Sequence, residues 1–202
     1  MHVILDWVFS NKLEIGGTLF GLIYIWFSIR QNIYTWPAGI LTALLYCGVF
    51  FEAKLYASMS LQGYYLIISV YGWYSWTKGG EKHDRLKVSR SSNVLWLTLI
   101  LLNLVLLGSM HVILSRFTDS PTPLADAFIT SLSIIATWML ARKKLEHWLI
   151  WIVGDLTSAV LYLYLGLYPT VFLFFVYAIM AVVGYNEWRK EPHLVASRTQ
   201  KV

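Results

Sequence analysis

Charged residues and reactive side chains are scarce in this sequence. Only 13% of the 202 residues are charged and 57% are hydrophobic, whereas ordinary soluble domains carry roughly 25% charged residues. The single cysteine, Cys47, excludes an internal disulfide and a cysteine-based metal site. A phosphate-binding glycine loop, a histidine cluster with metal spacing and a Ser-His-Asp set are also missing. The sequence therefore argues against an enzyme, and we expect neither a metal nor a cofactor.

Long apolar runs, separated by short polar loops, make up most of the chain. Seven of them occupy residues 15–29, 33–51, 56–76, 94–114, 124–141, 148–165 and 168–188. A helix needs about 20 residues to cross about 30 Å of hydrocarbon, so these runs predict an all-α membrane protein with seven transmembrane helices. The first 12 residues lack a basic region and a cleavage site, so we expect no cleaved signal peptide.

Lysine and arginine are unevenly distributed over the loops. Thirteen of the 16 fall on one side of the predicted membrane, and the other side holds Lys12, Lys54 and Arg116. Basic loops normally face the cytoplasm, which predicts an outer N-terminus and a cytoplasmic C-terminus. The net charge of +5 therefore marks a membrane face and does not indicate binding to nucleic acid.

Two parts of the chain resemble each other. A W-x-x-G-x-x-T pattern that begins at Trp36 returns at Trp151, an offset of 115, while Gly72 and Trp76 return 112 residues later, as does the Leu-Tyr pair at 55–56. This difference predicts a three-residue insertion in the loop at 51–54. The expected organisation is an outer segment (1–14), a first three-helix repeat (15–76), a basic cytoplasmic loop (77–93), a connector helix (94–114), an outer loop (115–123), a second three-helix repeat (124–188) and a cytoplasmic tail (189–202).

The connector helix has a physical purpose, because three helices reverse the direction of the chain and one more restores it. Both repeats then cross the bilayer in the same sense, in a 3+1+3 arrangement. Transporters with parallel repeats place their substrate site between the repeats near the midplane of the membrane. We therefore expect a transporter and not a catalyst.

Asp155 is the most informative residue, because it lies in the middle of an apolar run without a basic residue in any span. A carboxylate at the bilayer centre costs at least about 2.5–3.5 kcal/mol on insertion scales. Trp148 and Trp151 share its helix face at i, i+3 and i+7. Two indoles beside a carboxylate suit a flat, positively charged ring. A structural carboxylate and interfacial tryptophans are the alternative interpretation.

Two further polar residues are candidate substrate contacts. Gln62 and Ser69 lie at i and i+7 on one predicted helix face, and such groups either bridge helices or bind substrate. The glycines at 16, 17 and 21 form a helix-packing pattern, within the chain or in a homo-oligomer.

The sequence resembles the PnuC-type vitamin transporter family over residues 16–188. The resemblance is carried by Trp148-Leu-Ile-Trp151-Ile-Val-Gly-Asp155, by Gln62, and by Tyr71-Gly72-Trp73-Tyr74-x-Trp76. It implies a bundle like that of a full-length SWEET protein in the bacterial inner membrane. It also implies facilitated diffusion of an unphosphorylated vitamin, which a cytoplasmic kinase then traps. By motif position, it assigns substrate contacts to Trp148, Trp151, Asp155 and Gln62.

The resemblance leaves the substrate open between nicotinamide riboside and thiamine, which the PnuT subgroup transports. Both carry a fixed positive charge on an aromatic ring. Nicotinamide riboside transporters often have asparagine where this chain has Asp155, and a carboxylate also suits the aminopyrimidine of thiamine, which favours thiamine. Riboflavin is neutral and larger, and a SWEET-like sugar transporter is the other alternative. A retinal protein is excluded because the last predicted helix has no lysine.

Overall fold

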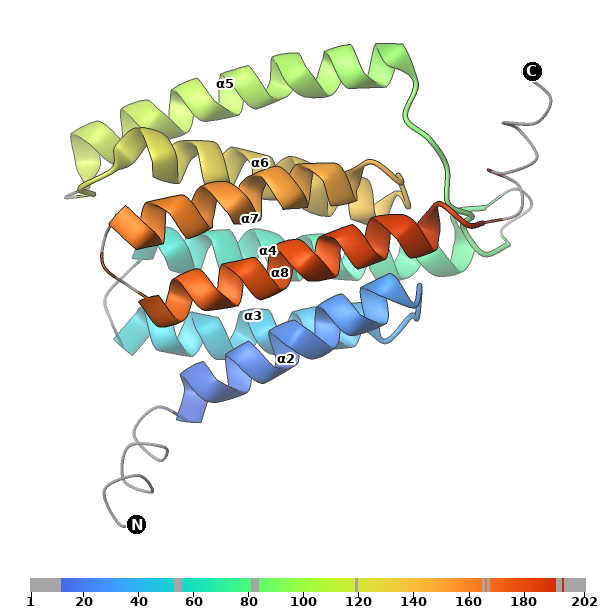
Figure 1. The fold of residues 1–202 in the computed structure, drawn as a ribbon, viewed down its shortest axis with the longest axis horizontal. Coiled ribbons are helices and arrows are strands. Elements are labelled where there is room, and N and C mark those ends of the chain that lie inside the picture. Colours follow the sequence, from blue (N-terminus) through green and yellow to red (C-terminus); the bar gives the residue numbers. More distant parts are fainter. Residues whose placement is uncertain are drawn as a thin grey trace. The chain divides into compact units, whose positions relative to one another are not determined.

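The computed structural model describes residues 12–52, 56–80, 84–118, 120–164, 166, 168–191 and 194. Within these residues the chain forms seven α-helices and no strand longer than an isolated bridge. Figure 1 shows the helices, which are α2 (Lys12–Ile29), α3 (Thr35–Glu52), α4 (Tyr56–Lys78), α5 (Asn93–Phe117), α6 (Pro123–Ala141), α7 (His147–Tyr164) and α8 (Tyr168–Trp188). The prediction of an all-helical chain with seven helices is confirmed.

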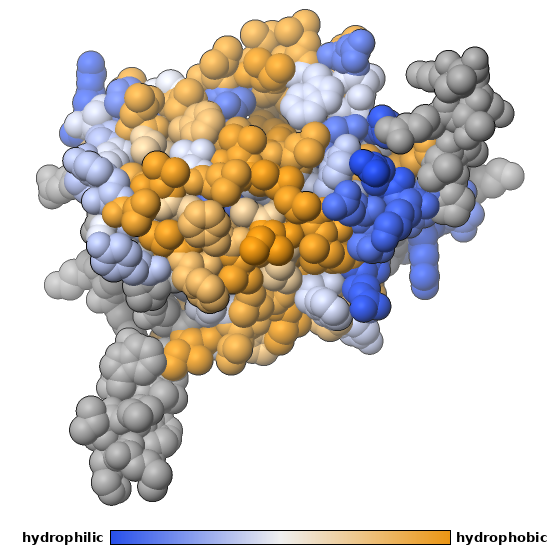
Figure 2. Space-filling model, in the orientation of Figure 1, coloured by the Kyte–Doolittle hydropathy of each residue, from blue (hydrophilic) through white to orange (hydrophobic). Residues whose placement is uncertain are grey.

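Hydropathy distinguishes the helices more sharply than the sequence prediction did. By length and composition alone, three described helices could cross a membrane: Asn93–Phe117, Pro123–Ala141 and Thr170–Trp188. The remaining helices carry more serine, glycine and tyrosine, which lower their mean hydropathy. Figure 2 shows apolar side chains over the flank of α8 and hydrophilic residues gathered near its end. Exposed apolar flanks of this kind suit contact with lipid.

The chain divides into two compact units, Met1–Leu86 and Lys87–Val202. In the first unit α3 packs against both α2 and α4. Glycines permit the close approach of α2 and α3, because a β-carbon on Gly17 would lie 2.9 Å from the ring of Tyr46, and one on Gly16 would lie 3.4 Å from Leu45. The glycine pattern at the start of α2 therefore serves packing within the chain.

In the second unit α5 packs on α6, α6 on α7, and α7 on α8. Its apolar core combines Leu99 of α5 with residues of α6 and α7, which are Ile135, Ala136, Met139 and Ile150. α5 begins after Ser92, whose hydroxyl accepts a hydrogen bond from the Leu95 amide, as an N-cap should.

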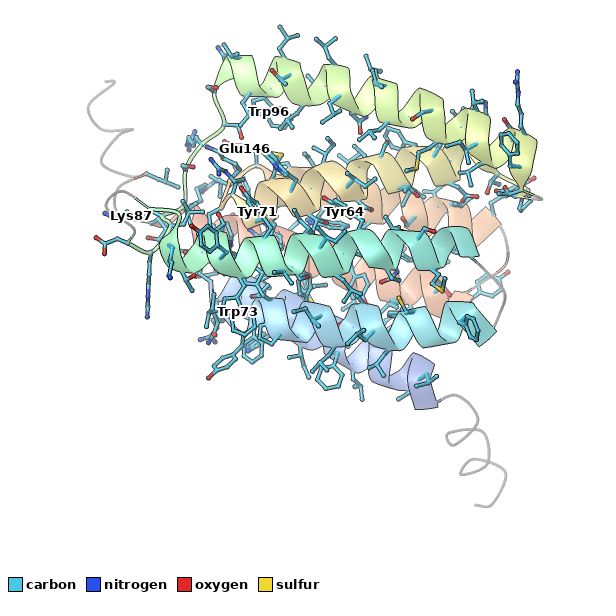
Figure 3. All side chains as sticks on the ribbon, turned by 180° about the vertical axis from the view of Figure 1, so that it is seen from behind. Tyr64, Tyr71, Trp73, Lys87, Trp96 and Glu146 are labelled. Carbon is cyan, nitrogen blue, oxygen red and sulfur yellow. The ribbon has the colours of Figure 1, made fainter. Side chains whose placement is uncertain are left out.

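A strap of residues 87–92 ties the start of α5 to the turn between α6 and α7. The Ser89 amide donates to Lys143 O and the Leu145 amide to Ser89 O, both at 2.9 Å. The Ser91 amide and hydroxyl each donate to Glu146 Oε2 at 2.9 Å. Figure 3 labels Lys87 and Glu146, between which the strap can be followed. The strap therefore holds α5 to the second unit.

The two three-helix segments repeat in structure at a constant offset of 112. The only non-glycine residues with positive φ among the described residues are Gln31, at 52°, and Lys143, at 47°, in equivalent turns. Their hydrogen bonds match as well, since Asn32 N donates to Phe27 O and Lys144 N to Met139 O, both at 2.9 Å. The helix pairs α3 and α7, and α4 and α8, also begin 112 residues apart.

The predicted offset of 115 and the insertion at 51–54 are therefore wrong. The structural equivalent of Trp36 is Trp148, and that of Gly39 is Trp151. A β-carbon on Gly39 would crowd Tyr24 and Ser69, whereas one on Gly154 would meet nothing within 4 Å. The W-x-x-G-x-x-T match was a coincidence of composition in two helices rich in tryptophan and glycine.

Candidate functional site

Asp155 lies at the middle of α7 and is only 5% exposed. No hydrogen bond or ion pair to its carboxylate occurs within the described part of the chain. Its oxygens are not among the fully enclosed polar atoms, so a ligand could reach them. Neighbouring hydroxyls on α7 are satisfied locally, since Thr157 donates to Val153 O and Ser158 to Gly154 O, both at 2.8 Å. Asp155 therefore stands out as a buried carboxylate whose bonding capacity is unused.

Trp151 lies one turn before Asp155 and on the same face of α7. It is partly buried and packs against the core cluster that contains Ala136 and Ile150. One side of the indole is thus held by the second unit, while part of it remains accessible. A ring held in this way beside a carboxylate can stack on an aromatic cation.

Trp148 has different surroundings, although it shares the same helix face. Its indole is 3% exposed and lies edge-on to Trp188, with ring centroids 5.7 Å apart at 90°. A β-carbon on Gly184 would lie 2.5 Å from it. In the first unit Trp36 packs in the same way on Gly72 and lies 5.3 Å from Trp76 at 85°. Because both repeats keep this arrangement, helix packing accounts for Trp148 without a ligand.

Gln62 and Ser69 share a face of α4 and are buried, at 9% and 3% exposure. Hydroxyls in apolar helices usually bond to the carbonyl one turn back, as Thr42 does to Ala38 O at 2.8 Å. Ser69 makes no such bond, and the side chain of Gln62 likewise has no hydrogen bond within the residues that the structure describes. These two groups of the first unit are therefore free to meet a polar ligand.

A second carboxylate, which the sequence analysis did not consider, shows the opposite condition. Asp126, in the first turn of α6, accepts hydrogen bonds from the hydroxyls of Ser120 and Thr122. It also lies near Tyr162, whose ring stacks on Phe174 at 5.3 Å. Hydroxyl donors at a helix start satisfy this carboxylate, so its environment is structural. Within the described residues no group of three or more metal-ligating side chains occurs.

Comparison with known proteins assigns the chain to a family. The family model described as nicotinamide mononucleotide transporter matches residues 11–190. The chain belongs to this family. A nicotinamide riboside transporter PnuC of Escherichia coli is 23% identical over 201 residues, covering 87% of this chain and 84% of that protein. A riboflavin/roseoflavin transporter RibM of Streptomyces davaonensis is 28% identical over 179 residues, covering 87% and 83%.

The fold agrees with this family. A crystal structure of the vitamin B3 transporter PnuC superposes with a TM-score of 0.73 at 21% identity, covering 94% of this chain and 85% of that one. The relatives are membrane transporters and not enzymes, so the predictions of a PnuC-type family, of a multi-pass membrane protein and of transport without catalysis are confirmed.

Proposed function

We propose that this transporter takes up an unphosphorylated, cationic B vitamin by facilitated diffusion. The observation that carries the proposal is the buried, unpartnered carboxylate of Asp155 beside the indole of Trp151. A carboxylate without a protein partner in an apolar helix is expensive unless a ligand or water meets it. An aromatic cation fits both groups, because its charge pairs with Asp155 and its ring stacks on Trp151.

The remaining contacts that we propose come from Gln62 and Ser69. Their free amide and hydroxyl groups suit the neutral polar substituents of a vitamin, such as a ribose or a hydroxyethyl group. Trp148 supports the binding face through its packing against Trp188 and Gly184. Its share in substrate binding is therefore indirect in this proposal.

Thiamine is the substrate that we favour, with nicotinamide riboside next. Asp155 can pair with the fixed charge of either ring, but a carboxylate can also accept a hydrogen bond from the amino group of an aminopyrimidine. Nicotinamide riboside has no such amino group on its ring. The relatives named nicotinamide riboside transporter support the second substrate.

Riboflavin is a second candidate, because the riboflavin/roseoflavin transporter RibM is 28% identical to this chain. Riboflavin is neutral, so it would leave the charge of Asp155 without a partner, and burying an unpaired charge is unfavourable. A protonated Asp155 would remove this objection, which makes the comparison of the three vitamins decisive.

The direction and mode of transport complete the proposal. We propose an inner-membrane uniporter with an outer N-terminus, a cytoplasmic C-terminus and two parallel repeats joined by α5, since basic residues concentrate in the loops of one side. The described residues contain no basic partner for Asp155 that could form an ion relay. Net uptake then requires a cytoplasmic kinase that phosphorylates the vitamin and so prevents its return.

Binding and transport assays test this function directly. Thiamine, nicotinamide riboside, riboflavin and glucose are titrated calorimetrically into the purified protein, and uptake of each binder is followed in proteoliposomes. We expect binding and equilibrative uptake of a cationic vitamin. Tight binding of riboflavin with no binding of either cation would contradict the proposal and favour the second candidate, while binding of glucose alone would favour a sugar transporter.

A further inference from the structure

Gly39 of α3 lies where helices α2 and α4 both approach α3. A β-carbon at this position would lie 3.1 Å from the ring of Tyr24 on α2 and 3.2 Å from Ser69 Oγ on α4. These distances are shorter than ordinary van der Waals contacts. The ring and the hydroxyl therefore both contact a patch of α3 backbone that only glycine leaves bare.

The second repeat carries the opposite set of side chains at the three equivalent positions. The constant offset of 112 pairs Gly39 with Trp151, Tyr24 with Ala136, and Ser69 with Ala181. Ala136 is fully buried, Ala181 is 2% exposed, and Trp151 packs on the cluster that contains Ala136. Each repeat thus places one aromatic ring at this junction, on α2 in the first repeat and on α7 in the second.

The Tyr24 hydroxyl has no hydrogen bond within the described residues, and it is not among the fully enclosed polar atoms. Tyr24 also lies close to Tyr64 and Tyr65 of α4, and Figure 3 labels Tyr64 and Tyr71 on that helix. A tyrosine used only for packing needs no free hydroxyl, and phenylalanine would fill the same volume. The free hydroxyl beside the free Ser69 hydroxyl points instead to a polar ligand.

We infer that Tyr24 is a substrate-binding residue of the first repeat, the counterpart of Trp151 in the second, and that Gly39 is the specificity-determining position that admits its ring. The inference rests on the proposed function and extends its site. The ring of Tyr24 offers an apolar face, and its hydroxyl, together with Ser69, recognises a hydroxyl group on the vitamin. The second repeat then supplies the charge and the first repeat supplies neutral polar contacts.

Titration of the purified full-length protein with thiamine tests the role of the hydroxyl. Tyr24→Phe keeps the ring and should raise the Kd about 3- to 10-fold, the range expected for one neutral hydrogen bond. Its melting temperature should stay unchanged. A thiamine analogue with an ethyl group in place of the hydroxyethyl group should bind wild type and Tyr24→Phe with equal affinity. Tyr74→Phe, on the exposed side of α4, is the matched control and should bind like wild type.

A second cycle tests whether Gly39 acts through Tyr24. Gly39→Ala should weaken thiamine binding in the wild-type background, because the new methyl group displaces the ring and the Ser69 hydroxyl. In a Tyr24→Ala background the same substitution should have a smaller effect, since the displaced ring is gone. Gly63→Ala, where a β-carbon would meet nothing within 4 Å, is the control.

The outcomes separate this inference from the function on which it rests. An unchanged Kd for Tyr24→Phe, in a protein that binds thiamine and depends on Asp155, would overturn the inference alone. An equal effect of Gly39→Ala in both backgrounds would remove the specificity role of Gly39. If wild type binds neither thiamine nor nicotinamide riboside, the proposed function itself fails. Should thiamine not bind, nicotinamide riboside and its deoxyribose analogue serve as the same ligand pair.

Discussion

Replacing Asp155 by asparagine should weaken binding of a cationic vitamin far more than binding of a neutral analogue. Asparagine keeps the shape and one acceptor oxygen but removes the charge. In the structure the carboxylate is 5% exposed and has no partner within the described residues, so the substrate would supply its counter-charge. The substitution thus isolates the interaction on which the proposed function depends.

The expected magnitude follows from this environment. A hydrogen bond to a charged group contributes about 1.5–3 kcal/mol, which corresponds to an increase in Kd of about 10- to 150-fold for the cation. Exclusion of water strengthens the attraction between the charges, and desolvation of both groups offsets part of that gain. The neutral analogue loses no ion pair, so its Kd should rise less than about fivefold, as for a neutral hydrogen bond.

Calorimetric titration of both ligands into both proteins gives the coupling between the two charges. The ligand pair is nicotinamide riboside and its ring-reduced neutral form. Asp126→Asn is the control, because Ser120 and Thr122 already satisfy that carboxylate, and it should leave the affinities alone. Equal losses for the charged and the neutral ligand in Asp155→Asn would refute the reasoning, since the carboxylate would then act through structure alone. Stronger binding of nicotinamide riboside with weaker binding of thiamine would identify this position as a selector between the two vitamins.

Ligand-free stability gives an independent view of the same residue. A carboxylate near the bilayer centre costs at least about 2.5–3.5 kcal/mol on insertion scales. Asp155→Asn should therefore raise the melting temperature of the empty transporter while it weakens substrate binding. A lower melting temperature would indicate that the carboxylate stabilises the fold.

Other predictions concern the tryptophans, the glycines and the transport cycle. Trp151→Ala should weaken binding by about 1–3 kcal/mol in a calorimetric titration, as for a desolvated stacking and cation–π contact, with the fold retained. Trp148→Ala should instead lower the free energy of unfolding by about 3–5 kcal/mol, measured by chemical denaturation, because its buried ring packs on α8. Gly184→Ala should cost about 1–3 kcal/mol, since its methyl group collides with Trp148, whereas Gly108→Ala, with open space around it, should be neutral or stabilising. Collapsing the proton and sodium gradients in proteoliposomes should leave equilibrative uptake unchanged, and gradient-driven accumulation would contradict a uniporter.

The helices were predictable because polar loops delimit the apolar runs. The expected run at 168–188 coincides with α8, and the others differ from the observed helices by at most three residues at either end. Local chemistry explains these differences, as at α5, where Ser92 caps the helix and so moves its start to Asn93.

The register of the repeat and the roles of the two tryptophans were not predictable from spacing. Trp148 and Trp151 look alike on one helix face, and only their neighbours distinguish them: Gly184 on α8 receives the first indole, and Ala136 on α6 makes room for the second. Tyr24 was missed for the same reason, because its contact with Gly39 joins two helices. Such contacts lie between distant parts of the chain, which a periodicity within one helix does not contain.

The constant offset of 112 has an evolutionary consequence. A duplicated segment that has neither gained nor lost a residue can diverge only by substitution, so the differences between the repeats lie within reach of point mutation. One base change turns an alanine codon into an aspartate codon, as would be needed to pass from Ala43 to its equivalent Asp155. One base change also turns the glycine codon GGG into the tryptophan codon TGG, the step from Gly39 to Trp151. Two mutations on a preserved backbone therefore separate the helix face that we assign to substrate from its plain counterpart in α3.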